Sequence, residues 1–426
     1  GKAFVSRIFY DSLSLSAWKK VPGSDPWSLR VNPSSGNLHP TEAYLICGPI
    51  EELSDDPGVF HYSPFHHALE SLKPMTEEEW AKLVGQPAEP LALISLTSIY
   101  WRESWKYGER AFRYCNHDVG HAIAAIAFAA ASAGWRARLL NSINVEDLSG
   151  LLGIQEKLGP GSEHPDCLLA LYPDTGEGGR SSADRLELAG PVLEQLSTRE
   201  LAGSPNELSS SYHQWPIIDI VTDACRSTPT VSISDNSVND EPKAEGDGSW
   251  SASKSGLTAR QIFRRRRSAV AMDGITPISK QNFFGMVQRC LDPAGVPNGV
   301  LPWKPFVSLA IFVHRVTGLQ QGLYLLTRDE SHESQLRRRL KETFRWESPD
   351  GCPDCLSLYL LEQGDYEDIA RNVSCYQDIA SGGAFSLGML ARFETPIRTS
   401  GPGVYPRLFW ETGLIGQILY LEAEAR

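Results

Sequence analysis

A short segment near the start of the chain combines small hydroxyl and amide side chains with two prolines. It precedes an apolar, strand-like run and reads Arg30-Val31-Asn32-Pro33-Ser34-Ser35-Gly36-Asn37-Leu38-His39-Pro40. Serine hydroxyls and asparagine amides both donate and accept hydrogen bonds, so such a loop can hold a flat polar heterocycle. By composition alone the segment is more typical of a capping turn between a helix and a strand.

A lysine and a tyrosine stand side by side at Lys106-Tyr107, within Trp101 to Arg110. Such a pair can transfer a proton when burial or a nearby cation lowers a pKa. Taken alone, the pattern is more typical of a surface lysine beside a packed tyrosine. His121, which follows at the start of a long apolar segment, could face a cofactor or make a structural hydrogen bond.

Four consecutive arginines, Arg264 to Arg267, are followed by Ser268. Adjacent guanidinium groups repel one another, so they usually lie on a solvated face or bind an anion. Phosphate is a suitable anion because the planar arginine fork donates two hydrogen bonds at once. A nuclear-targeting or RNA-binding run is the alternative. The net charge of −12 disfavours nucleic acid and anionic membranes as partners.

The length of 426 residues favours two domains with a connection. We expect domain 1 at residues 1–202, a polar or disordered linker at 203–256, and domain 2 at 257–426. No run reaches the roughly 20 apolar residues of a membrane span, and Ala122 to Trp135 is expected to be a buried helix. The eight scattered cysteines indicate reduced thiols and a cytoplasmic enzyme.

The two halves repeat one order of elements. In each half a strand-like run, at Ala43–Cys47 and Leu309–Val313, precedes a glycine and an aromatic residue. A further apolar strand follows, and we pair Ala92–Leu96 with Leu356–Leu360. An acidic residue and a glycine then open a long helix, in Asp118-Val119-Gly120-His121 and in Glu411-Thr412-Gly413-Leu414. The second copy lacks a counterpart for residues 134–172, as expected of a truncated or degenerate half.

These motifs together resemble the nitroreductase superfamily. The loop at Pro33 resembles the family's Pro-Ser-Ser-x-Asn-x-Gln-Pro motif, and its His-Pro ending resembles the SagB-type branch of azoline dehydrogenases. Lys106-Tyr107 is similar to the catalytic Lys-Tyr pair of that branch. Arg266-Arg267-Ser268 resembles the Arg-x-Ser that opens nitroreductase domains, although Val270 stands where the family often has a basic residue.

The resemblance implies an α+β fold with two nitroreductase-like domains, each a mostly antiparallel sheet flanked by helices, packed as an intrachain pseudo-dimer. It also implies one FMN between the halves. Lys106 and Tyr107 would be catalytic, and the cofactor would be held by Arg30, Pro33, Ser34, Ser35, Asn37, Arg266, Arg267 and Ser268.

The activity implied by the resemblance is oxidation of azolines to azoles in modified peptides, with a small molecule or modified peptide as substrate and peptide-modifying enzymes as partners. Two alternatives remain: an NAD(P)H-dependent reductase of nitro or quinone compounds, and a non-catalytic scaffold with a degenerate flavin site. No metal is expected, because Cys352-Pro353-Asp354-Cys355 has no second ligand pair. The sequence also lacks the GxGxxG, Walker A and GxSxG motifs.

Overall fold

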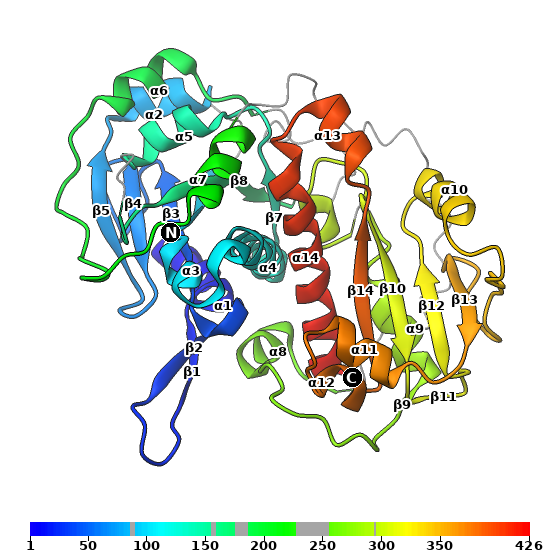
Figure 1. Cartoon of the computed structure of the whole chain (residues 1–426). Coiled ribbons are helices and arrows are strands. Elements are labelled where there is room, and N and C mark those ends of the chain that lie inside the picture. The colour runs from blue at the N-terminus through cyan, green and yellow to red at the C-terminus, as the bar shows by residue number, and fades with distance from the viewer. Residues whose placement is uncertain (86–89, 155–158, 175–185, 227–254, 294) are drawn as a thin grey trace.

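The computed structural model describes residues 1–85, 90–154, 159–174, 186–226, 255–293 and 295–426, which form two main sheets beside a central helix pair (Figure 1). The first half contains α1 (Lys2–Ser12), β1 (Leu15–Lys19), β2 (Trp27–Arg30), β3 (Thr41–Cys47), β4 (Gly58–Ser63), β5 (Ala68–Pro74), α2 (Glu77–Val84), β6 (Ala92–Ser98), α3 (Trp101–Tyr107), α4 (Ala111–Ser132), β7 (Trp135–Leu139), α5 (Val145–Leu152), β8 (His164–Pro173), α6 (Gly190–Ser197) and α7 (Pro216–Cys225).

The second half is shorter. It contains α8 (Ala259–Arg265), β9 (Ile278–Ser279), α9 (Lys280–Gln288), β10 (Val307–Val313), β11 (Val316–Thr317), β12 (Gly322–Leu326), α10 (Glu330–Arg339), β13 (Leu358–Gln363), α11 (Glu367–Val373), α12 (Ile379–Gly382), β14 (Phe385–Ala391), α13 (Glu394–Ser400) and α14 (Val404–Ala425). The fold is therefore the expected α+β class. Among the described residues, no helix is long and apolar enough to cross a membrane.

The first sheet has the order β5-β4-β3-β6-β8-β7, and all of its strand pairs are antiparallel. Both β3 and β6 are buried along their whole length, because apolar clusters lie on the two faces of the sheet. Side chains alternate between those faces. Leu45 packs in the cluster that includes α4, whereas Ile46 packs in the cluster that includes α2, α5 and α6.

The second sheet has the order β13-β12-β10-β14 and is also antiparallel. Its central strand β10 lies between β12 and β14, as β3 lies between β4 and β6. This order corrects our pairing of the repeats. The counterpart of β6 is β14, and the run Leu356–Leu360 lies largely in β13, which occupies the outer position of β5. The pairing was wrong because β13 is apolar, whereas β14 is half-exposed and contains Ser386 and Gly388.

Helices α4 and α14 pack against each other between the two sheets (Figure 1). They meet at Gly120 and Gly413, which occupy equivalent positions in the two sequence repeats. A Cβ atom on Gly120 would lie 2.2 Å from the Trp410 carbonyl oxygen, and one on Gly413 would lie 2.1 Å from the His117 carbonyl oxygen. One continuous apolar cluster therefore extends from β3 through both helices to β10.

Polar side chains bond across this crossing. Trp410 Nε1 donates to Asn116 Oδ1 at 2.8 Å, and Thr412 Oγ1 lies 2.6 Å from His117 Nδ1. His121 Nδ1 lies 3.1 Å from Gln417 Oε1, which gives His121 the structural hydrogen bond that was one of its two sequence interpretations. These contacts fix the position of one helix along the other.

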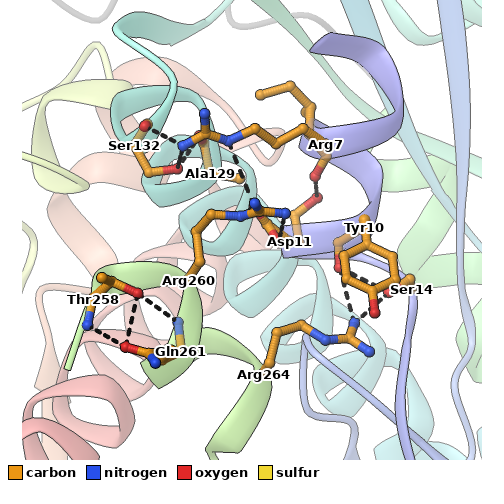
Figure 2. Close-up of polar contacts among 12 residues, drawn as sticks. Arg7, Tyr10, Asp11, Ser14, Ala129, Ser132, Thr258, Arg260, Gln261 and Arg264 are labelled. Carbon is orange, nitrogen blue, oxygen red and sulfur yellow. Dashed lines mark hydrogen bonds and ion pairs between the residues drawn. The ribbon is translucent and has the colours of Figure 1, made fainter. Parts of the chain in front are cut away.

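The start of the second half packs onto the first half. Helix α8 begins with a capping box, in which Thr258 and Gln261 exchange side-chain and backbone hydrogen bonds. Its Arg260 donates to the buried Asp11 carboxylate at 2.5 and 3.2 Å, and Arg264 donates to the Tyr10 carbonyl and Ser14 hydroxyl (Figure 2). Arg260 and Arg264 therefore join α8 to the region of α1.

The described part of the expected linker at 203–256 contains a helix. Helix α7 buries Ile218 against Tyr100 and Phe112 of the first half, so this part of the segment docks on the first half. Residues 227–254 lie outside the described residues. Before this segment, the last helix of the expected domain 1 is α6.

The glycine crossing gives a test of how the halves are held together. Replacing Gly413 by Ala places a methyl group inside the α4 backbone and should lower the free energy of unfolding by about 1–3 kcal/mol or more. Gly190→Ala, at the start of α6 with open space around it, should change it by less than about 0.5 kcal/mol. Chemical denaturation measures both, and equal effects would contradict the crossing.

Candidate functional site

The loop before β3 has an unusual backbone conformation. Gly36, Asn37 and His39 all have positive φ values, of 60°, 61° and 53°. Such φ values are costly for a side chain as large as histidine, and they often occur at functional sites. Two hydrogen bonds hold this shape: the His39 backbone N donates to Ser34 Oγ at 2.8 Å, and Asn37 Nδ2 donates to the Ser28 carbonyl at 2.9 Å.

Two buried carboxyl groups lie behind the loop. Ser35 donates to Asp118 of α4 from its backbone N at 3.0 Å and from its hydroxyl at 3.2 Å. Ser34 Oγ donates to Glu103 of α3 at 3.4 Å. Burial, together with the nearby Asp118 carboxylate, raises the pKa of Glu103 to about 9. Burial also raises the pKa of Asp118 to about 7, against the lowering effect of the Ser35 bonds.

The second half contains a comparable arrangement. Glu411 of α14 accepts hydrogen bonds from the backbone N atoms of Phe306 and Val307, at 2.9 and 3.1 Å, where β10 begins. It is also paired with Arg328. In each half, a carboxyl group close to the crossing glycine therefore holds the segment that leads into the central strand.

Lys106 and Tyr107 lie directly over this loop, although the sequence separates them from it by about 70 residues. A Cβ atom on Gly36 would lie 2.4 Å from Tyr107 Oη and 3.0 Å from Lys106 Nζ. The Lys106 side chain is exposed, and Tyr107 packs edge-to-face on Tyr114 with ring centroids 4.7 Å apart. The structure thus brings together two of the predicted clusters.

The third cluster also reaches this region. The Arg266 side chain is buried, and its Nη2 donates to the carbonyls of Val31 and Arg30 at 2.9 and 3.2 Å. Its Nη1 donates to Ser268 Oγ at 3.2 Å, and its guanidinium lies 5.1 Å from the centre of the Tyr420 ring. The predicted Arg266–Ser268 pair therefore contacts the residues directly before the Pro33 loop.

The other predicted basic residues are placed differently. Arg267 is exposed and donates to backbone carbonyls of its own segment, the nearest being that of Arg266 at 2.7 Å. Arg30 donates to the Thr41 carbonyl at 2.9 Å, so this bond ties β2 to the start of β3. Arg265, which we did not assign to the site, pairs with Glu424 at 2.8 Å.

Several buried polar atoms around the loop have no hydrogen-bond partner among the described residues. They are Asn32 Oδ1, both ring nitrogens of His39, Glu103 Oε2 and Arg266 Nε. Buried polar groups are normally paired, so this concentration indicates a place for a ligand with donors and acceptors. The free Arg266 Nε in particular fits a phosphate oxygen. The residues present therefore fit a phosphate-bearing heterocycle such as FMN.

Sequence reasoning missed the buried pair Glu103 and Asp118, which supports the loop from behind. Asp118 lies inside an alanine-rich helix, where its carboxyl group is expected to be buried. Because a buried carboxyl group requires hydrogen-bond partners, Asp118 could have been identified from the sequence as a group that holds a neighbouring segment. His39 was read only as part of the motif. Burial, together with nearby Arg30, lowers its pKa to about 3, so its ring is neutral and offers one donor and one acceptor.

Comparison with known proteins agrees with the fold. Residues 27–170 match the model of the nitroreductase family. A protein from Anabaena variabilis described as a nitroreductase superposes with a TM-score of 0.67 at 18% identity, covering 99% of this chain and 80% of that one. The chain therefore has a nitroreductase-like fold. Among curated proteins, no sequence match is found.

Two further structures align over part of the chain. The Escherichia coli microcin synthetase complex has a TM-score of 0.32 at 19% identity, covering 41% of this chain and 64% of that one. A protein from Ralstonia eutropha described as a nitroreductase has a TM-score of 0.30 at 16% identity, covering 40% and 71%. Superpositions this partial do not establish a shared fold.

The buried Glu103 predicts a pH dependence. Its pKa rises from 4.5 to about 9 on folding, so the native state retains a proton that the unfolded chain loses. Stability should therefore fall as pH rises through this interval, by up to about 1.4 kcal/mol per pH unit for one group. The Glu103→Gln variant should show a weaker dependence of stability on pH, whereas the exposed Glu109→Gln variant should show the wild-type dependence. A steeper fall in Glu103→Gln would contradict the assignment.

Proposed function

We propose that the chain is an FMN-dependent oxidoreductase with one site between its halves. The observation that carries the proposal is the meeting of the Pro33 loop with Lys106-Tyr107 and with Arg266. These groups come from α3, the segment before β3 and the segment after α8. The match of residues 27–170 to the nitroreductase family supports a flavin as the cofactor.

The phosphate would be held by Arg266, Arg267 and Ser268. Arg266 and Ser268 already contact each other, and the exposed Arg267 adds positive charge beside them. The ring would lie near Pro33, Ser34, Ser35 and Asn37, with Arg30 fixing the end of the loop through Thr41. Bound FMN supplies two-electron redox chemistry, while the protein supplies position and protons.

Proton transfer would belong to Lys106 and Tyr107. Tyr107 Oη and Lys106 Nζ both point at Gly36, where the loop carries no side chain. In the proposed dehydrogenation, an azoline loses one proton and one hydride to become an azole, and either residue can take the proton at Nζ or Oη. The exposure of Lys106 fits a substrate that arrives from solvent, including an azoline in a modified peptide delivered by peptide-modifying enzymes.

One observation favours a second candidate, a non-catalytic scaffold. The Ser35 donors are used by Asp118, and Arg266 Nη2 is used by two backbone carbonyls. Donors that already have partners within the protein are not free to bond a flavin, which is what a scaffold with a degenerate flavin site would show. Flavin binding and turnover separate the two candidates.

The phosphate assignment can be tested by FMN titration. Arg266→Met should weaken FMN binding about tenfold or more, because a charge-assisted hydrogen bond contributes about 1.5–3 kcal/mol. Arg265→Met is the matched control, since Arg265 is two-thirds exposed and pairs with Glu424. Quenching of flavin fluorescence measures both. Equal affinities for the two variants would contradict the assignment.

The catalytic assignment predicts a different pattern. Lys106→Met and Tyr107→Phe should each lower the rate of azoline oxidation about 10²–10⁴-fold, because each removes one proton-transfer group. FMN affinity should stay unchanged, and exposed Lys20→Met serves as the control. Single-turnover absorbance of the flavin measures the chemical step. Turnover with NAD(P)H and a simple acceptor, without azoline oxidation, would instead favour a reductase.

A further inference from the structure

A cavity lies between the halves, and its lining residues differ from those of the candidate flavin site. Its volume is about 90 Å³, and its walls come from α4, β8, α5, α7 and α14. Neither the Pro33 loop, Lys106-Tyr107 nor Arg266–Ser268 lines it. The cavity is therefore a site distinct from the candidate flavin site.

Arg407 of α14 is the distinctive group in its wall. The side chain is largely buried, yet it has no hydrogen bond or ion pair with any residue that the structure describes. Its guanidinium carbon lies 5.4 Å from the centre of the Trp303 ring, and the Cys167 thiol is close enough to interact with its charge. Burial lowers the pKa of Arg407 to about 10, so it remains charged at neutral pH. The guanidinium therefore presents an unpaired positive charge in the wall of the cavity, which favours an anion there.

The neighbouring polar groups do not supply that anion. Asp166 accepts a hydrogen bond from Ser98 at 2.7 Å, and burial raises its pKa to about 8, so it is largely protonated at neutral pH. Asn116 accepts from Trp410, and Arg226 pairs with Asp223 at 3.3 Å. Burial also raises the pKa of the Cys167 thiol well above its usual value. The positive charge of Arg407 is thus uncompensated within the cavity.

The size and remaining walls restrict the anion. Apolar groups predominate, including Phe112, Leu140, Leu148 and Trp410. A dry cavity of about 150 Å³ holds benzene, so this smaller one suits a short chain better than an aromatic ring. A fully hydrated ion such as phosphate would leave the apolar walls without a partner. A short aliphatic chain ending in a carboxylate satisfies both the walls and Arg407.

We propose that this cavity binds a short-chain aliphatic carboxylate, with its two oxygens on the Arg407 guanidinium and its chain against Leu140 and Leu148. Helix α7 forms one wall through Thr222 and Cys225, so the expected connecting segment helps to enclose the ligand. This site is independent of the proposed flavin chemistry and shares no residue with it.

Calorimetric titration of the full-length chain, with whatever flavin it retains, tests the proposal. Propionate should bind, with benzoate and inorganic phosphate binding at least about tenfold more weakly. Arg407→Met should weaken propionate about tenfold or more. The matched control is Arg398→Met on α13, whose side chain is 77% exposed. Absence of propionate binding at about 10 mM, or equal binding by Arg407→Met, would overturn the proposal.

Thermal unfolding separates ligand binding from a structural role. Without ligand, Arg407→Met should be as stable as the wild type or more stable, because it removes an unpaired buried charge. A lower Tm would show a structural role and overturn the proposal. If Arg407→Met does not fold, Cys225→Phe decides, since it fills the cavity from α7 and leaves Arg407 in place. Loss of propionate binding in that variant supports the site, and unchanged binding overturns it.

Discussion

The close crossing of α4 and α14 is the contact on which the rest of the structure depends. Two backbones can approach this closely only where both helices lack a side chain, and Gly120 and Gly413 provide that space for each other. The approach lets one apolar cluster continue from the first sheet to the second. The two halves therefore share a core and are not merely tethered by a connecting segment.

The crossing also positions the chemistry. Asp118, two residues before Gly120, holds the Ser35 end of the loop, so the loop is fixed to the same helix that crosses α14. Tyr420, on α14, packs against Arg266 from the start of the second half. The proposed site thus combines a loop from one half with a cation from the other. Each group depends on the relative position of the two helices.

Much of this arrangement could be predicted from the sequence. The repeated acidic residue and glycine identified the two central helices, and the strand runs at Ala43 and Leu309 became the central strands β3 and β10. The outer strand of the second sheet was misassigned, because apolar composition does not distinguish an edge strand from an interior one. The roles of Arg260 and Arg264 were also not visible, since their partners lie about 250 residues away.

The central claim is that one complete flavin site is built from both halves of one chain. The most direct test is the amount of flavin released per chain from the purified, FMN-saturated protein, measured by its visible absorption. The account predicts about one FMN per chain. A protein that remains colourless after reconstitution, or that holds about two FMN per chain, would contradict it.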